Sequence, residues 1–210
     1  MTLGLGTGST AYWFIVAVGE LVAGGMRLSG VPTSAASEAL AARFGIPMTE
    51  LDSSGVDLAV DGADAVDPRL RLIKGRGGAL VREKVVAASA RRFVVVVDES
   101  KLCDRLRGPI PVEVLPFGAG ATLAAVGQVL GAEPELRRGS AGVSVLSDNG
   151  NLLADARVDR LDDPEGTAER LQAIPGLVGH GLFLGMADLV VSAGGDGLTT
   201  ELTPSRPRSA

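Results

Sequence analysis

Residues 73–98 read IKGRGGALVREKVVAASARRFVVVVD, and this stretch decides the fold. A glycine-rich turn leads into a helical pattern at 79–90, and a run of β-branched residues then predicts a strand at 93–97. A strand that is apolar on both faces is typical of a parallel sheet covered by helices. The stretch therefore predicts an α/β fold built from strand–helix–strand units.

The same alternation continues on the N-terminal side. Short apolar runs predict strands at 3–5 and 56–60, and helical patterns occupy 11–24 and 34–44. Ser34 is the expected N-cap of the second of these helices. We therefore expect a Rossmann-like domain with a mostly parallel sheet.

The pattern changes near 107–111, where proline and glycine interrupt it. We expect strands at 111–115, 143–146, 152–158 and 178–184, and helices at 121–130 and 164–173. This β-α-β-β-α-β order predicts a second, smaller ferredoxin-like α+β domain. A strand at 187–191 is expected to return to the first domain, and the tail at 203–210 is expected to be disordered. The predicted division is 1–106 plus 185–210 for the catalytic domain and 107–184 for the smaller one.

Composition excludes several classes of function. The chain has 210 residues, a formal net charge of −5, one His and one Cys. This inventory excludes an internal disulfide framework and a Cys/His zinc site, and it offers no basic field for nucleic acid. No signal peptide is apparent and no apolar run is long enough to span a membrane, so we expect a soluble, cytoplasmic protein. Proton chemistry would rest on carboxylates, hydroxyls and lysines, and the lysines are only Lys74, Lys84 and Lys101.

Residues 4–10, GLGTGST, predict a phosphate-binding loop. Glycines let backbone N–H groups approach an anion, and the following helix adds the positive end of its dipole. The hydroxyls of Thr7, Ser9 and Thr10 can add donors. The loop is neither a Walker A motif, which needs a lysine after the last glycine, nor a dinucleotide fingerprint. A tight turn with capping hydroxyls is an equal alternative.

Two carboxylates, Asp61 and Asp64, follow a predicted buried strand. Ligands of open α/β sheets bind at the carboxyl ends of strands, and Gly62 permits a sharp turn there. Such a pair suits the recognition of sugar hydroxyls or proton transfer. The alternative is a capped turn with solvated aspartates.

The turn at 73–84 carries the densest signal. Lys74 precedes glycines that can present backbone donors, and Glu83 follows in the first turns of a helix, where its ionised form is favoured. A general base needs that form. Lys101 also lies beyond the end of a strand and can reach a ligand. The alternative is that these charges are solvated or paired.

Other reactive residues receive structural interpretations. His180 lies between two glycines in a predicted strand and has no identifiable catalytic partner. Cys103 is expected to be a buried small side chain. The turn at 194–197 is assigned no chemistry.

Taken together, the motifs resemble the type A ribose-5-phosphate isomerase family. The matching segments are GLGTGSTA at 4–11, VPTSAASEALAARFGIP at 31–47, VDGADAVD at 60–67, IKGRGGALVREK at 73–84, VVVVDESK at 94–101, PIPVEV at 109–114, SDNGNLLAD at 147–155 and IPGLVGHGLF at 174–183. Their order and spacing hold over nearly the whole chain.

The resemblance implies an aldose–ketose isomerase of the pentose phosphate pathway that interconverts D-ribose 5-phosphate and D-ribulose 5-phosphate through an enediolate. It also implies no metal or organic cofactor and a homodimer or homotetramer. By the family's pattern Glu83 is the proton-transferring base, and Asp61, Asp64 and Lys74 are the other catalytic groups. The implied substrate-binding residues are Thr7, Gly8, Ser9, Thr10, Asp61, Gly62, Ala63, Asp64, Lys74, Gly75, Arg76, Gly77 and Lys101.

The chain departs from the family pattern in two places. Family members usually carry a helix and a full strand, with a substrate-binding lysine, before the loop, so we expect the first strand to have lost part of its pairing. Ala65 stands where the family commonly has Glu. The alternative function is therefore an impaired or inactive paralogue that binds sugar phosphates. Amino-sugar phosphate deaminases, CoA transferases and repressor-type sugar-phosphate sensors are further alternatives. A deaminase would be expected to use a histidine, but His180 lies outside every candidate site, and neither a CoA-transferase glutamate motif nor a DNA-binding helix-turn-helix is found.

Overall fold

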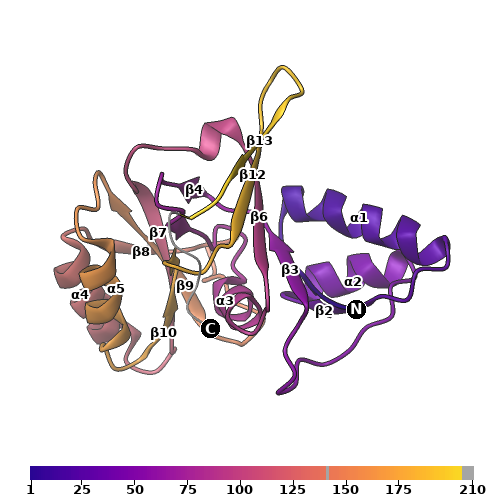
Figure 1. The fold of residues 1–210 in the computed structure, drawn as a ribbon. Coiled ribbons are helices and arrows are strands. Elements are labelled where there is room, and N and C mark those ends of the chain that lie inside the picture. The colour runs from indigo at the N-terminus through magenta and orange to yellow at the C-terminus, as the bar shows by residue number, and fades with distance from the viewer. Residues whose placement is uncertain (141, 205–210) are drawn as a thin grey trace. The chain divides into compact units, whose positions relative to one another are not determined.

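The computed structural model describes residues 1–140 and 142–204, which form two compact units (Figure 1). Of the described residues, the first unit contains Met1–Ala63, Arg82–Lys101 and 185–204, and the second contains Asp64–Val81 and those of 102–184. This differs from the predicted division, 1–106 plus 185–210 against 107–184, because residues 72–73 pair with 182–183 on one side and with 65–66 on the other, rather than with the parallel sheet. Of the tail predicted to be disordered, 205–210 lie outside the described residues.

The first unit contains a six-stranded sheet. Its strands are β1 (Thr2–Leu5), β2 (Ser29–Pro32), β3 (Leu58–Asp61), β6 (Phe93–Asp98), β12 (Leu189–Ala193) and β13 (Thr199–Leu202), in the order β13-β12-β6-β3-β1-β2. All neighbours are parallel except β12 and β13. The predicted Rossmann-like, mostly parallel sheet is confirmed, although β2 and β13 were not predicted.

Strand β1 keeps its partners on both sides. It pairs with β2 over Thr2 to Leu5 and with β3 from Leu3 to Leu5. Leu3 and Leu5 are buried. The expected loss of pairing is therefore wrong, because four residues suffice to place this strand in the interior of the sheet.

Three helices and one helical turn accompany this sheet: α1 (Ser9–Ala23), α2 (Ala35–Arg43), α3 (Leu80–Ala88) and the 3-10 turn η1 (Glu99–Lys101). Ser34 caps α2 as predicted, since its hydroxyl accepts the N–H of Ser37 while the Ser37 hydroxyl accepts the N–H of Ser34. Buried apolar side chains of β1, α1 and α2, among them Leu5, Ile15 and Ala41, form one core. Helix α3 begins in the second unit and continues into the first.

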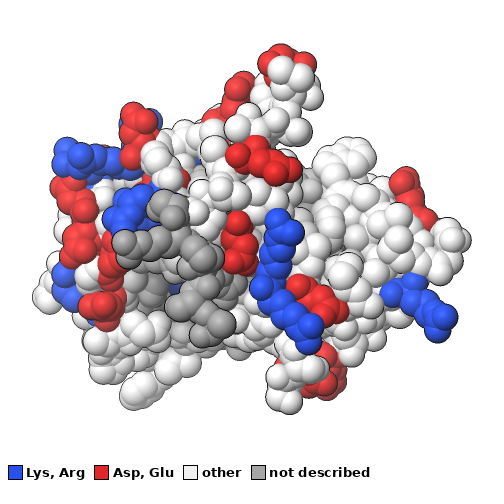
Figure 2. Space-filling view, in the orientation of Figure 1, with Lys and Arg blue, Asp and Glu red and all other residues white. Residues whose placement is uncertain are grey.

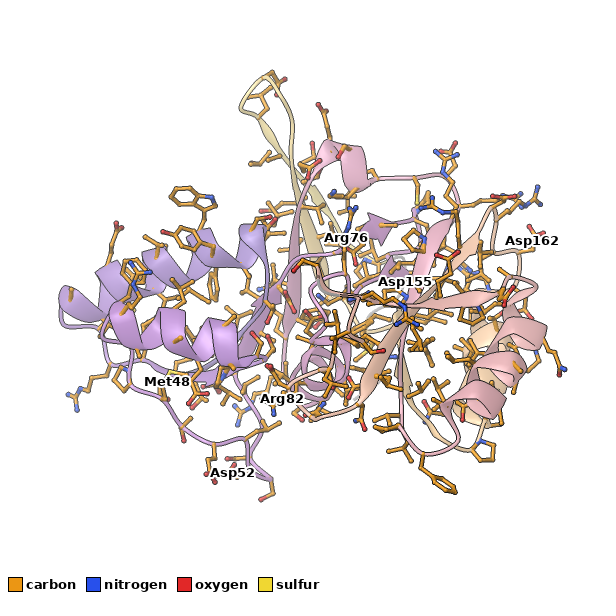
Figure 3. The ribbon with its side chains drawn as sticks, turned by 180° about the vertical axis from the view of Figure 1, so that it is seen from behind. Met48, Asp52, Arg76, Arg82, Asp155 and Asp162 are labelled. Atoms are coloured by element: carbon orange, nitrogen blue, oxygen red, sulfur yellow. The ribbon has the colours of Figure 1, made fainter. Side chains whose placement is uncertain are left out.

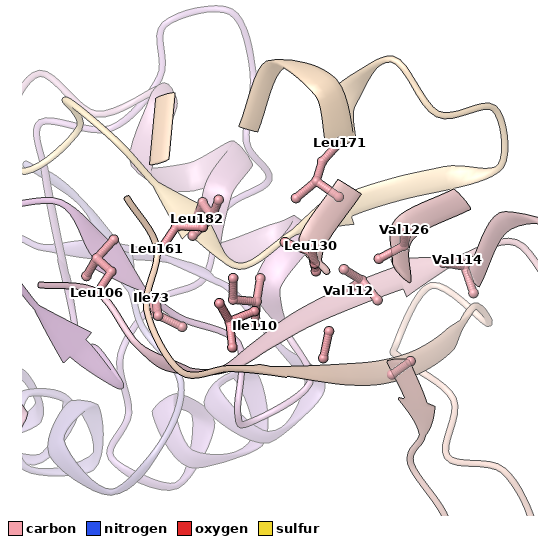
Figure 4. Close-up of a cluster of buried hydrophobic side chains, with 13 residues drawn as sticks. Ile73, Leu106, Ile110, Val112, Val114, Val126, Leu130, Leu161, Leu171 and Leu182 are labelled. Carbon is pink, nitrogen blue, oxygen red and sulfur yellow. The ribbon is translucent and has the colours of Figure 1, made fainter. Parts of the chain in front are cut away.

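The second unit contains a four-stranded antiparallel sheet with the order β10-β7-β9-β8. Its elements along the chain are β7 (Gly108–Val114), α4 (Ala119–Leu130), β8 (Pro134–Leu136), β9 (Leu152–Val158), α5 (Pro164–Gln172) and β10 (Leu177–His180). The predicted ferredoxin-like β-α-β-β-α-β order is confirmed. Helices α4 and α5 lie side by side, and apolar residues of the helices and of the sheet share one core (Figures 1 and 4).

Two strand predictions in this unit need correction. The second strand is β8, not 143–146, where only Ser144 and Leu146 form isolated bridges. Val143 and Leu146 are exposed, whereas Leu136 packs against the core, so burial favours β8. The strand predicted at 178–184 is two strands, because Gly181 separates β10 from β11 (Leu182–Phe183). Strand β11 pairs with β5 (Leu72–Ile73) instead of continuing the four-stranded sheet. Strand β5 also pairs with β4 (Ala65–Val66).

Candidate active site

The predicted site residues fall on both units. Thr7, Gly8, Ser9, Thr10, Asp61, Gly62, Ala63, Glu83 and Lys101 belong to the first unit, and Asp64, Lys74, Gly75, Arg76 and Gly77 belong to the second.

The glycine-rich loop of the first unit joins β1 to α1. Gly8 is the N-cap residue with φ 110°, a conformation that favours glycine, and it makes no side-chain cap hydrogen bond. The backbone N–H groups at this helix start are therefore not consumed by a cap. The loop and the start of α1 line one side of a cavity of about 530 Å³, with Ala36, Ser37 and Leu40 from α2 on the other.

The loop hydroxyls differ in what they do. The Thr7 hydroxyl lies 2.7 Å from the Thr33 hydroxyl and donates to the Ser34 hydroxyl at 2.8 Å. Ser9 is exposed and Thr10 is partly exposed. Thr7 thus holds the loop to the segment before α2, a role that differs from the ligand donor expected from sequence.

Asp61 fixes the loop from the neighbouring strand. It ends β3 and is 4% exposed, and its Oδ1 accepts the N–H of Thr7 at 3.1 Å and that of Gly62 at 2.8 Å. A Cβ on Gly6 would lie 2.3 Å from this same oxygen, so only glycine fits there. The parallel register of β1 and β3 therefore brings the first carboxylate of the predicted pair to the predicted phosphate loop.

Lys101 ends the helical turn η1 that follows β6. In the same turn, the hydroxyl and the N–H of Ser100 donate to Asp98. The side-chain hydrogen bond from Ser100 is the main cause that lowers the pKa of the Asp98 carboxyl. The turn thus keeps a carboxylate next to Lys101 at the end of the strand.

Glu83 lies in the first turn of α3 and is 4% exposed. The positive end of a helix dipole favours an ionised carboxylate at this position. The next residue, Lys84, is half-buried, and burial lowers the pKa of its ammonium group to about 8. The start of α3 therefore carries two ionisable groups withdrawn from solvent.

The glycine-rich turn of the second unit begins at Lys74. This lysine is 3% exposed, its N–H donates to the carbonyl of Gly181 at 2.8 Å, and its Nζ lies 5.5 Å from the centre of the Phe183 ring. Such an ammonium–ring contact is a cation–π interaction that holds the charge in place. The role of Phe183 is not predictable from the sequence, because a single aromatic residue at the end of a strand carries no local signal.

Asp64 lies against the same turn. Its N–H donates to the carbonyl of Ile73 at 2.8 Å, and its Oδ2 accepts the N–H of Arg76 at 3.0 Å. Asp64 and Arg76 line a cavity of about 580 Å³ within this unit, together with Ala65 and residues of β7, β8 and β9. Ala65, which replaces the family's usual glutamate, thus faces this cavity.

Arg137 and Asp155 form a further contact that no sequence motif predicts. The Arg137 guanidinium donates to both oxygens of Asp155, each at 2.7 Å, and to the carbonyls of Gly75 and Arg76, each at 3.0 Å. Figure 3 labels Arg76 and Asp155, which this guanidinium joins. No motif marks an arginine that meets its partners only after the sheet has formed.

The two remaining reactive side chains have structural environments. His180 is buried, and its Nδ1 accepts the N–H of Leu182. The Cys103 thiol is partly buried rather than buried, and it donates to the carbonyl of Val66. Burial raises the pKa of this thiol, which disfavours the reactive thiolate.

Surface charge and side-chain clustering give further information about the class of protein. Figure 2 shows acidic and basic side chains interspersed on the visible face, without a broad basic patch. In the part of the chain that the structure describes, no group of three or more His, Cys, Asp or Glu side chains is arranged to hold a metal ion. Nor does any helix of these residues have the length and apolar character needed to cross a membrane.

Comparisons with known proteins agree with the fold and with these motifs. The family described as ribose 5-phosphate isomerase A (phosphoriboisomerase A) matches residues 29–197. Ribose-5-phosphate isomerase A of Roseiflexus sp. (strain RS-1) is 50% identical over 98% of this chain and 90% of its own length. Ribose 5-phosphate isomerase from Plasmodium falciparum superimposes with a TM-score of 0.93 at 35% identity, covering 98% of this chain and 92% of that one.

A solved D-ribose-5-phosphate isomerase in complex with phospho-erythronic acid has a TM-score of 0.91 at 42% identity, covering 97% of this chain and 90% of that chain. The chain belongs to the ribose 5-phosphate isomerase A family, and it is an aldose–ketose isomerase that interconverts D-ribose 5-phosphate and D-ribulose 5-phosphate.

Proposed function

We propose that Glu83 is the base that moves the proton between C2 and C1 of the sugar phosphate. Its carboxylate takes the proton from C2 of the open-chain aldose, and the electron pair forms a C1–C2 double bond while the C1 carbonyl oxygen becomes an oxyanion. Return of the proton to C1 and transfer of the O2 proton to O1 give the ketose. Two features support this role: burial excludes water from the carboxylate, and the N-terminal turn of α3 favours its ionised form.

Lys74 is the cation that stabilises the developing oxyanion. A buried ammonium group fixed over an aromatic ring needs little reorganisation when negative charge appears, which is what electrostatic catalysis requires. Asp61 and Asp64 hold substrate hydroxyls, and one of them assists ring opening. Both use one oxygen to hold backbone N–H groups, so their carboxylates are oriented.

The loop at Thr7–Thr10 binds the phosphate through its backbone N–H groups, the exposed hydroxyl of Ser9 and the partly exposed hydroxyl of Thr10. The uncapped start of α1 supports this proposal. Gly62, Ala63, the turn at 74–77 and Lys101 provide the other substrate contacts. The relative solved with phospho-erythronic acid supports a sugar-phosphate ligand of this class.

We propose that the enzyme works as a homodimer or homotetramer in the cytoplasm, without a metal or organic cofactor and without nucleic-acid or membrane partners. Exposed apolar side chains such as Trp13 and Phe117, which are 70% and 92% exposed, support self-association. A phosphorylated sugar is charged and does not cross membranes, which supports action in the compartment where it is made.

The test is a coupled assay of ribose 5-phosphate turnover with the Glu83→Gln variant. We expect kcat to fall by about 1,000-fold or more, because an amide cannot accept the proton. The control is Glu20→Gln, which removes an exposed carboxylate of α1 and should leave turnover unchanged. Full activity of a folded Glu83→Gln enzyme would refute the assignment, and loss of wild-type activity in EDTA would refute a cofactor-free mechanism.

A further inference from the structure

Arg137 follows β8 and lies outside the residues proposed to touch the substrate. Its guanidinium is largely buried, with 16% of the side chain exposed. One edge of the group forms a bidentate pair with Asp155 of β9. Nη2 also donates to the carbonyl of Gly75, and Nη1 donates to the carbonyl of Arg76. Four of the donor contacts that a guanidinium can make are thus committed to three residues.

The segment that Arg137 holds is the turn proposed to contact the substrate. The peptide groups of Arg76 are fixed on both sides, because its N–H donates to Asp64 while its carbonyl accepts from Arg137. The carbonyl of Gly75 accepts from Arg137 and also from the N–H of Gly78, each at 3.0 Å. The turn therefore has few ways to change shape while these bonds persist.

The turn also lies against the sheet that carries Asp155. A Cβ built on Gly75 would lie 3.2 Å from Pro111 of β7, and one on Gly78 would lie 3.0 Å from Leu153 of β9. Pro111 and Asp155 are partners in the register of these two strands. Arg137 thus ties the turn to the rigid sheet beneath it.

We infer that Arg137, held by Asp155, is a positioning residue for substrate binding. It sets the directions of the backbone N–H groups of the turn, and through the Arg76 peptide it sets the carboxylate of Asp64. This inference rests on the proposed role of the turn and of Asp64. Lysine cannot replace Arg137, because a single ammonium nitrogen cannot pair with both carboxylate oxygens and donate to two carbonyls at once.

The experiment compares Arg137→Lys and Arg137→Gln with Arg138→Gln as the matched control. Arg138 is the adjacent arginine, is exposed, and donates to the carbonyl of Gly142. Amide hydrogen exchange of Arg76 and Gly78 is measured together with KM and kcat for ribose 5-phosphate and with the melting temperature. For both Arg137 variants we expect exchange to become about tenfold faster and KM to rise about tenfold, with a smaller change in kcat. The control should match the wild type in all of these.

Unchanged exchange and unchanged KM in a folded Arg137→Lys enzyme would overturn the inference. A proportional loss of all signals with a lower melting temperature, in both Arg137 variants and in Asp155→Asn, would also overturn it, since that result indicates a purely structural pair. Amide hydrogen exchange of the turn is measured without turnover. If the proposed role of Glu83 is wrong, the Glu83→Gln enzyme keeps its activity, and the exchange result for the Arg137 variants is unaffected.

Discussion

The loop after β1 and the turn before α3 both present backbone N–H groups at the start of a helix, but different contacts hold them. In the loop, the carboxylate of Asp61 accepts from backbone N–H groups, and the parallel register of two neighbouring strands is enough to bring it there. In the turn, Arg137 donates to backbone carbonyls from 61 and 62 residues further along the chain. The loop is thus shaped by its own sheet, and the turn by a side chain that arrives from another part of the sequence.

The largest expected effect follows from Gly6→Ala in the loop. The new Cβ would lie 2.3 Å from Oδ1 and 2.7 Å from Cα of Asp61, and the backbone of a central strand cannot move away. We expect a loss of about 4 kcal/mol in the free energy of unfolding, measured by urea titration. The control is Gly120→Ala, which has open space around it in α4. A loss below about 1 kcal/mol would show that the loop is not held as tightly as its contacts indicate.

The corresponding change in the turn is Gly75→Ala. Here φ is +111°, and the new Cβ would lie 2.7 Å from the Cβ of Leu80, so strain and a clash act together. We expect a loss of about 3 kcal/mol in the free energy of unfolding. Gly8→Ala is the matched control, because its φ is +110° with nothing within 4 Å, and strain alone should cost about 1 kcal/mol. Equal losses in the two variants would contradict the clash with Leu80.

A smaller effect is expected for Thr7→Val, which tests the side-chain support of the loop. The variant removes the hydroxyl that contacts Thr33 and Ser34. We expect the free energy of unfolding to fall by about 1 kcal/mol, and KM for ribose 5-phosphate to rise as the loop loosens. Thr49→Val, at an exposed threonine, should change neither. A Thr7→Val enzyme with unchanged stability and KM would show that Asp61 alone fixes the loop.

The smallest effect concerns the helices that follow the two segments. Helix α1 has no acidic or basic residue in its first turn, whereas α3 has Glu83 in its first turn and Lys84 directly after it. The pKa of Lys84 falls from 10.5 in the unfolded chain to about 8 in the folded chain, so folding releases its proton between these two values and stability rises with pH in that window. Below about pH 8 the full cost of burying the charge is present.

Lys84→Met should remove that cost. We expect the free energy of unfolding to increase by about 1 kcal/mol at pH 7, and we expect this gain to shrink as the pH rises from about 8 to 10.5. Thermal unfolding across this pH range measures both. Arg43→Met, at an exposed position on α2, is the control and should show no such pH dependence. A gain that stays constant with pH would contradict burial of the ammonium group as its cause.

The same contrast explains what the sequence predicted and what it did not. Asp61, Glu83 and the loop glycines were predicted because strand ends and helix starts are local features that a few adjacent residues encode. The Ser34 cap and the parallel sheet were predicted for the same reason. Strand β8 was misplaced because 134–136 is short and only the packing of Leu136 on a distant core selects it.

Contacts between side chains that are far apart in the sequence could not be predicted from it. Phe183 reaches Lys74 from another strand, and Arg137 reaches the turn only when β8 and β9 are paired. Thr7 was expected to donate to a ligand, but the threonine and serine before α2 occupy its hydroxyl once β1 and β2 are aligned. In each case the tertiary register, rather than the residue type, determines the partner.

The path of the chain through the first unit has a consequence for synthesis on the ribosome. Strand β6, FVVVVD at 93–98, pairs with β3 on one edge and with β12 on the other, and β12 is made only after the whole of the second unit. Until residues 189–193 emerge, an apolar, β-branched strand has an open edge, which is a template for pairing with a neighbouring nascent chain. The second unit can form meanwhile, because its residues are made before β12. The risk of aggregation through β6 is therefore greatest after the second unit has folded and before β12 completes the sheet of the first unit.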